Sequence, residues 1–437
     1  MTAPSEAARP SRHHLWWVAL LVLWGPLYRA LMDKAWMAVG GLPLVGQWAQ
    51  LQSAAELVSA PAMAGVGMGL TVLTAQSPRA QHLPLWLGAC VLGALFTAPL
   101  LLAALYWPQV LGGWLHLDAA AQHNLAWAAT SGWSGLVLGL LSAYWLGQQH
   151  QARVLGLTVL TGLPPLIVLG LHTLRPEPAD AAQTLQAVLH TGIVLNALAL
   201  IGLLLALGRW LLGTPRAGLL LGQALRRVAV YLPAGLSIGL LTPLSAMAIR
   251  SSLAAQIDWE AAGTATALWR ASDWVLSGAA AVLYYHHLPR LSQWAQQGQL
   301  REHLPRVLRQ VLWPSLALLL LLWALQSAVL PLLYDERLQA SPGVTAAVTA
   351  AFWAGDLARI AAAVFLYALF ALHASKTIAW TEWLSQPLLA ALLVLGAGQS
   401  LWLAGTAHLG TYVLYAGVNA VAVGWWVWRR PGRGASA

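Results

Sequence analysis

The sequence contains very little charge for its length. Only 8% of its 437 residues are Asp, Glu, Lys or Arg, whereas 59% are hydrophobic and the mean hydropathy is +0.65. A soluble domain cannot bury that proportion of apolar surface. Apolar runs of about 20 residues, the length that crosses a bilayer as a helix, recur to the end of the chain. The composition therefore predicts an all-α integral membrane protein.

Cysteine and lysine are nearly absent. Cys90 is the single cysteine, which excludes an intrachain disulfide and any multi-cysteine metal site. Of 23 basic residues only Lys34 and Lys376 are lysines. The net charge of +9 does not indicate nucleic acid as a partner, because the chain has no long basic run and no soluble basic domain. Loops that face the cytoplasm account for most of this positive charge.

Motifs of soluble catalysis are also missing. The chain has no phosphate-binding GxxxxGK[ST] loop and no HExxH pair. His286 and His287 are adjacent, but no third metal ligand is nearby in the sequence. We therefore expect no catalytic residue, no bound metal and no cofactor, with coupling to a proton or a cation as the one open possibility. The function is expected to lie within the membrane.

Twelve membrane-spanning helices are predicted from the apolar runs. They lie near 15–38, 50–75, 83–107, 123–147, 153–174, 184–209, 227–250, 262–287, 310–333, 348–373, 377–401 and 405–428.

This pattern divides the chain into two halves of six spans. The predicted domains are a tail (1–14), a six-helix bundle (15–209), a linker (210–226), a second six-helix bundle (227–428) and a tail (429–437). The linker is apolar and basic, which suits a helix lying on the membrane surface. An equal division of this kind is typical of transporters built from two repeats around a central cavity.

The basic residues predict the orientation. Arginines gather in alternate turnarounds, among them Arg79, Arg153, Arg227 and Arg290, whereas the intervening turns are acidic or neutral. Because basic loops stay in the cytoplasm, both termini are predicted to be cytoplasmic in a bacterial inner membrane.

Several predicted spans carry charged residues. A charge at the bilayer centre costs at least about 2.5–3.5 kcal/mol, so such side chains usually face a protein interior or a wet cavity. Arg29 and Asp33, Arg270 and Asp273, and Asp356 and Arg359 are spaced to pair on one helix face. One interpretation is that these pairs only neutralise each other. The other is a shared cavity, in which arginine binds an anionic headgroup through paired N–H groups.

The cavity interpretation selects eight candidate residues. Those expected to bind a diphosphate headgroup are Arg270, Arg359, Arg29 and Arg250. Those expected to act as cavity or coupling acids are Asp273, Asp356, Glu382 and Glu56.

Two stretches resemble a known family. LWRASDWVLSGAAAVLYYHHLPRLSQ (268–293) resembles the "W…R.SD…YYLPRLS" region of Wzx-type polysaccharide flippases, and Gly40–Gln76 resembles their first hairpin. These are translocases of O-antigen and enterobacterial-common-antigen lipids, in the MOP superfamily of MATE and lipid II transporters. The resemblance covers Arg270 and Asp273, whereas the other candidates come from charge placement. The family's hairpin usually carries a further basic residue, and here its turn has only Arg79.

The resemblance implies a MATE-like fold and a non-enzymatic flippase. Its cargo would be an undecaprenyl-diphosphate-linked oligosaccharide, moved from the cytoplasmic to the periplasmic leaflet by alternating access. Membrane lipids, a polysaccharide polymerase and a chain-length regulator are the implied partners.

Two alternatives stay open. A MATE-like drug or cation antiporter would have the same architecture, with carboxylates dominating its cavity. A membrane polysaccharide polymerase or ligase would need a sizeable periplasmic loop, and the predicted loops are short.

Overall fold

The structure is a computed structural model that describes residues 12–117, 119–174, 180–215, 217–334, 336, 338, 343–397 and 400–429. The predicted tails at 1–14 and 429–437 lie mostly outside these ranges. Within the described ranges every regular element is helical. In the first half these are α1 (Arg12–Pro61), η1 (Ala62–Gly67), α2 (Met68–Gln76), η2 (Arg79–Gln81), α3 (His82–Tyr106), α4 (Pro108–Trp114), α5 (Ala119–Gly147), α6 (Gln151–Thr173) and α7 (Ala181–Gly213). They continue with α8 (Ala217–Ala229), α9 (Leu232–Gln256), α10 (Trp259–Val282), η3 (Leu283–His287), α11 (Leu288–Gln296), α12 (Leu300–Ala324), α13 (Gln326–Tyr334), α15 (Ala346–Ala371), α16 (Ser375–Ala397) and α17 (Leu401–Arg429).

The helices match the predicted spans. Eight helical stretches are long and apolar enough to cross a membrane, and one of them, Ala19–Thr74, has 56 residues, enough for two crossings. The three remaining predicted spans are the helices α10, α16 and α17, which are 24, 23 and 29 residues long. The chain is a multi-pass membrane protein, and the prediction of an all-α fold with two bundles of membrane helices is confirmed.

The first two spans are joined without a loop. Gly41 has φ 70° and ψ −162°, a combination that side chains disfavour, and it separates two helical segments within α1. The chain therefore bends sharply where a tight connection is needed, and the second segment continues through η1 into α2. The π-helical turn η1 follows Pro61, where proline removes a backbone donor from the helix.

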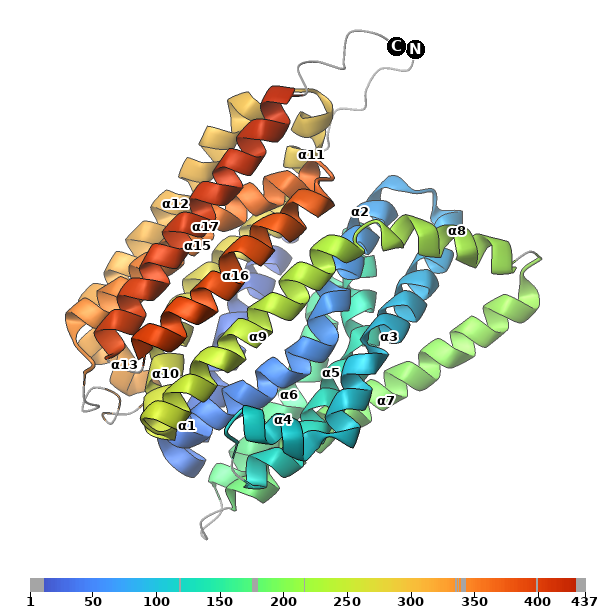
Figure 1. The fold of residues 1–437 in the computed structure, drawn as a ribbon. Helices are drawn as coiled ribbons and strands as arrows, with labels where there is room; N and C mark the ends of the chain where they lie inside the picture. Colours follow the sequence, from blue (N-terminus) through green and yellow to red (C-terminus); the bar gives the residue numbers. More distant parts are fainter. Residues whose placement is uncertain are drawn as a thin grey trace.

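Two lobes can be followed in Figure 1, the N-lobe from α1 to α7 and the C-lobe from α9 to α17. In the N-lobe, α5 packs against α1, η1 and α2 and against α3, α6 and α7. In the C-lobe, α15 packs against α10, α12 and α17, and α16 packs against α9 and α17. The two lobes meet where α1 contacts α9 and α10. The linker helix α8 lies between the lobes in sequence and packs on α3 in space.

The two ends of the molecule differ in charge. We call the end where α1 begins and α17 ends the terminal end, and the opposite end, where Gly41 lies, the distal end (Figure 1). Described basic residues at the terminal end are Arg79, Arg153, Arg209, Arg226, Arg227, Arg290, Arg301, Arg306, Arg309 and Lys376. In the described distal turns and the first residues after them, the charged residues are Asp180, Asp258, Glu260 and Glu336.

Glycines allow the lobes to approach closely. A Cβ atom on Gly46 would lie 3.0 Å from the backbone nitrogen of Gly263, and one on Gly263 would overlap the carbonyl of Leu42. We call the interface between the two lobes the seam. Further along it, a Cβ on Gly65 would lie 2.6 Å from the Cα of Gly235. The backbone of α1 therefore rests directly on α10 at the distal end, and η1 rests directly on α9 nearer the terminal end.

We predict that Gly263→Ala lowers the thermal stability of the protein, because its methyl group would push α1 and α10 apart. Forced overpacking of this kind costs about 1–3 kcal/mol. Cys90 is the single cysteine and only 3% exposed, so a thiol-reactive dye reports unfolding of the unlabelled protein. The matched control is Gly202→Ala in α7, where a Cβ meets nothing within 4 Å. Equal melting temperatures for the two variants would contradict this packing.

Candidate functional site

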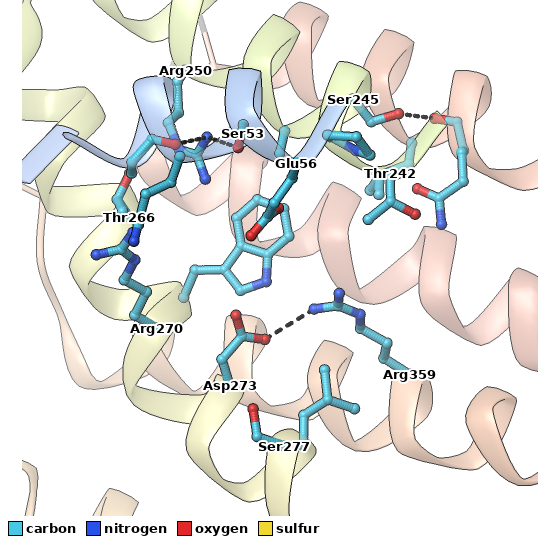
Figure 2. Close-up of a pocket in the computed structure, with 18 of the residues that line it drawn as sticks. Ser53, Glu56, Thr242, Ser245, Arg250, Thr266, Arg270, Asp273, Ser277 and Arg359 are labelled. Carbon is cyan, nitrogen blue, oxygen red and sulfur yellow. Dashed lines mark hydrogen bonds and ion pairs between the residues drawn. The ribbon is translucent and has the colours of Figure 1, made fainter. Parts of the chain in front are cut away.

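A cavity of about 310 Å³ lies between the two lobes. Residues of α1 form one wall, and residues of α9, α10, α15, α16 and α17 form the others. We call it the arginine cavity, because its charged lining residues are Arg29, Arg250, Arg270, Arg359, Glu56 and Asp273. Figure 2 shows Arg250 and Arg270 on one side and Arg359 on the other, with Glu56 and Asp273 between them. Six of the eight candidates thus line one cavity.

Arg270 is the most fully engaged of the four arginines. From α10 it forms an ion pair with Asp33 and a hydrogen bond to Gln52, both on α1. Tyr334 of α13 donates a hydrogen bond of 2.9 Å to the second carboxylate oxygen of Asp33. Asp33 is 1% exposed, and the Arg270 side chain is 13% exposed. A buried charge of this kind is stable only when it is paired and hydrogen-bonded.

Arg250 and Arg29 also reach across the seam. Arg250 of α9 donates from one nitrogen to the carbonyl of Ala49 at 3.2 Å and to the hydroxyl of Ser53 at 2.9 Å, both on α1. Its Nε atom is buried and has no partner in the described structure. Arg29 of α1 donates to the hydroxyl of Ser277 on α10 at 3.2 Å. These contacts leave several N–H groups of both guanidinium groups unused within the described protein.

Arg359 pairs within the C-lobe. It lies on α15 and forms an ion pair of 3.0 Å with Asp273 of α10 and a longer one of 3.8 Å with Asp356. Its guanidinium carbon stands 5.4 Å from the ring centre of Tyr412, a distance at which a cation is attracted by the aromatic face. Arg359 and Tyr412 both belong to the lining of the arginine cavity.

The pairs expected from sequence spacing are largely replaced by pairs between helices. The prediction that Arg270 pairs with Asp273 was wrong, because Arg270 bonds to Asp33 and Asp273 bonds to Arg359. Arg29, predicted to pair with Asp33, contacts Ser277 instead. Within one helix only the Asp356–Arg359 pair is present. Ion pairs within one helix are mostly absent, because neighbouring helices place partners closer to the same guanidinium groups.

The carboxylates occupy three kinds of environment. Glu56 is exposed to the arginine cavity and has no hydrogen bond or ion pair in the described structure. Asp356 lies behind the cavity wall, fully buried, with Ser272 donating to it and His408 Nε2 at 3.2 Å. Glu382 is 1% exposed and accepts a hydrogen bond from Tyr415. Asp356 and Glu382 are therefore not part of the cavity lining.

A second hollow continues from the arginine cavity. It has a volume of about 350 Å³ and shares Ala280 with the arginine cavity. We call it the tyrosine hollow; its lining residues are Met63, Gly67, Met68, Gly139, Ser142, Ala143, Leu146, Ala280, Ala281, Tyr284 and Tyr367. Because α5 ends at Gly147 beside Leu146, the hollow leads toward the terminal end.

The lobes are held together differently at the two ends. At the distal side of the cavity, Gln50 bonds to Met247 and Ser251, and Lys34 donates to the carbonyl of Leu332 at 2.7 Å. At the tyrosine hollow, a hydrogen bond of 2.6 Å joins Thr71 to Tyr284. Together with the glycine contacts of α1 and α10, the distal bonds separate the arginine cavity from the distal end. On the terminal side, the arginine cavity continues into the tyrosine hollow.

Sequence reasoning missed Asp33, Gln52 and Tyr334 as parts of this site. Asp33 was noticed only as the neighbour of Arg29, although a carboxylate in an apolar run is itself a signal of a functional interior. Gln52, a polar residue in the predicted span 50–75, could extend the cavity surface, but a lone polar residue in a span is more often an interhelical hydrogen-bonding group. Tyr334 lies 301 residues from Asp33, and nothing in its local sequence marks it.

Comparison with known proteins identifies the fold. No protein-family model and no curated protein matches the sequence. Solved structures do match. A mutant of the Vibrio cholerae MATE transporter VcmN has a TM-score of 0.68 at 16% identity, with 96% of each chain covered. An inward-facing multidrug resistance MATE transporter of the MOP superfamily has 0.64 at 10%, covering 92% of this chain and 94% of that one. The eukaryotic MATE transporter AtDTX14 has 0.59 at 14%, covering 95% and 97%. The chain has the MATE fold.

We predict that Asp356→Ala strongly destabilises the protein, because Arg359 and His408 would lose a partner that is fully buried. Removing one member of a buried ion pair typically costs about 3–5 kcal/mol. The melting temperature, followed through the reactivity of Cys90, should fall by many degrees. Glu260→Ala, an exposed acid in the first turn of α10, is the control and should change it little. A stable Asp356 variant would show that the network contributes little.

Proposed function

We propose that this protein is a flippase for a polyprenyl-diphosphate-linked oligosaccharide, of the Wzx type, which works by alternating access between its two lobes. The observation that carries the proposal is the gathering of four arginines in one cavity inside the membrane, against two carboxylates in the same lining. Such a cavity has an excess of positive charge and suits an anionic headgroup.

Arginine is well matched to a diphosphate. Its planar guanidinium group offers two parallel N–H bonds to phosphate oxygens, and it keeps its charge in a membrane interior. Arg250 and Arg359 approach the cavity from different helices, as Figure 2 shows, and each engages the protein through a single nitrogen. Their remaining N–H groups are available to phosphate oxygens, whereas Arg270 must first give up a protein partner.

The two hollows suit the parts of such a cargo. The diphosphate would bind among the arginines, and the sugars would extend into the tyrosine hollow, whose hydroxyl groups and aromatic rings include Ser142, Tyr284 and Tyr367. The polyprenyl tail would remain in lipid, in a gap between helices. Glu56 and Asp273 would limit the affinity for the diphosphate, so that the cargo can leave on the other side.

The proposed orientation in the membrane follows from charge. The terminal end carries the basic turns, and by the positive-inside rule it would face the cytoplasm of a bacterial inner membrane. In this proposal the cargo enters from the cytoplasmic side. Asp273, Asp356 and Glu382 are candidates to exchange a proton or a cation that resets the empty carrier. The flipped unit would pass to a polysaccharide polymerase with its chain-length regulator.

A second candidate function is the export of cationic compounds. Glu56 is an unpaired carboxylate exposed to the arginine cavity, and the rings of Trp269 and Tyr412 lie in the same lining. Those groups suit a cationic aromatic load. The similar solved structures include multidrug resistance transporters. The excess of arginine disfavours this candidate, because a cation would be repelled by most of the cavity's charge.

Transport of the proposed cargo can be measured in liposomes. The purified protein is reconstituted with a labelled undecaprenyl-diphosphate oligosaccharide on one leaflet, and an added glycosidase reports the glycan that reaches the other. We expect Arg270→Gln and Arg359→Gln each to slow flipping by about 10- to 150-fold, since a hydrogen bond to a charged group contributes about 1.5–3 kcal/mol. The double variant should be inactive.

The control keeps the net charge comparable. Arg153→Gln removes an exposed arginine at the start of α6 that does not line the cavity, and this variant should flip at the wild-type rate. Wild-type flipping by a folded Arg270→Gln, Arg359→Gln double variant would refute the proposal. Absence of flipping together with efflux of a cationic dye would establish the second candidate.

A further inference from the structure

Most of the cavity's arginines hold the lobes together. Arg270 bonds from the C-lobe to Asp33 and Gln52, Arg250 bonds from the C-lobe to Ser53, and Arg29 bonds from the N-lobe in the opposite direction. Arg359 differs, because its acidic partners belong to its own lobe. A ligand that takes N–H groups from the first three arginines therefore acts on the seam between the lobes.

Asp33 is the central member of this arrangement. Among the described residues it is the carboxylate that forms an ion pair across the seam, and it is almost inaccessible, whereas Asp273 is 24% exposed. Both of its oxygens are used, one by Arg270 and the other by Tyr334. Lys34, the next residue, also crosses to the C-lobe, where it donates to the carbonyl of Leu332. This short segment of α1 is thus fastened to α10 and α13 on the distal side of the cavity.

The Asp33 carboxylate and a phosphate group compete for the same donor. Arg270 uses both terminal nitrogens on α1, one for Asp33 and one for Gln52. A guanidinium group has a fixed fork, so a bidentate bond to phosphate displaces at least one of these partners. The displaced bond is one that holds the lobes together at the distal side, where the cavity is closed.

We propose that Asp33 is a positioning residue that keeps the empty protein closed at its distal end through Arg270, and that a diphosphate bound by Arg270 releases this closure. The inference rests on the proposed function for the identity of the anion, but the closure by Asp33 does not depend on it. In the empty protein the ion pair favours the conformation that is open toward the terminal end. The bound diphosphate replaces the ion pair and allows the lobes to separate at the distal end.

The proposal assigns different roles to two similar pairs. Asp33 with Arg270 and Asp273 with Arg359 each join one carboxylate to one cavity arginine. Replacing either carboxylate by its amide removes one negative charge from the same region and removes one ion-pair partner from a cavity arginine. Only the change at Asp33 removes an ion pair between the lobes. The two variants therefore separate an effect of the seam from a general effect of charge.

The test measures the distance between the lobes at the distal end. Leu174, which follows α6 in the N-lobe, and Leu325, which follows α12 in the C-lobe, are 81% and 47% exposed. Both are replaced by spin-labelled cysteine in a Cys90→Ala background, and distances are recorded by pulsed electron paramagnetic resonance in lipid nanodiscs. Because the helices ending at these residues belong to different lobes, opening at the distal end lengthens the distance.

We expect Asp33→Asn to raise the population with the longer distance at least about tenfold without any ligand, from the few per cent or less typical of a minor conformation. Asp273→Asn should leave the distribution as in the parent. Tyr334→Phe, which keeps the ion pair and removes one hydrogen bond, should give a smaller shift of the same sign. Added pyrophosphate should lengthen the distance in the parent protein. Undecaprenyl diphosphate should do so at lower concentration if the lipid headgroup is the source of the anion.

Each result bears on a separate part of the proposal. Unchanged distances in both the Asp33→Asn and the Tyr334→Phe variants would overturn the closure by Asp33, while leaving the proposed flippase function intact. Equal opening in the Asp33→Asn and Asp273→Asn variants would also overturn it, because charge alone would then explain the shift. Opening in Asp33→Asn without any response of the parent to pyrophosphate or the lipid diphosphate would overturn release by the anion and count against the proposed function.

Discussion

The constraint on which this structure depends is the stabilisation of guanidinium groups inside a membrane protein. An arginine in hydrocarbon is unfavourable unless it is paired, hydrogen-bonded or in contact with water. Here Arg270 is satisfied by α1, and Arg359 is satisfied by Asp273 and the ring of Tyr412. Since these arginines and most of their partners come from different helices, satisfying them fixes how α1, α10 and α15 are placed. The same side chains then surround the cavity.

The packing of the backbone complements this electrostatic requirement. Small residues at Gly46, Gly263, Gly65 and Gly235 bring α1 and η1 into direct contact with α10 and α9. Interfaces of this kind are usual in membranes, where association depends on close packing and interhelical hydrogen bonds rather than on the hydrophobic effect. On the distal side of the cavity, polar bonds fasten α1 to α9, α10 and α13. The tyrosine hollow leads from the cavity toward the other end.

Much of the fold followed from the sequence, because long apolar runs mark membrane helices directly. The cavity arginines were also predictable, since a charge within such a run indicates an interior site. Their partners were not, because Asp33 and Arg270 lie 237 residues apart and the spacing of Arg29 and Asp33 suggested local pairing. Burial of Glu382 behind the cavity was equally hidden. Glu382 shares a face of α16 with Gln386, which does line the cavity, so helical spacing alone did not separate the two residues.

The central claim is that the cavity selects a diphosphate headgroup. Native mass spectrometry of the purified protein, offered an equal mixture of undecaprenyl diphosphate and uncharged undecaprenol, tests this claim most directly. The account predicts that the protein retains the diphosphate lipid in preference to the alcohol, and that a variant lacking both Arg270 and Arg359 loses the preference. Equal retention of the two lipids by the unaltered protein would show that the arginines do not form a headgroup site and would contradict the account.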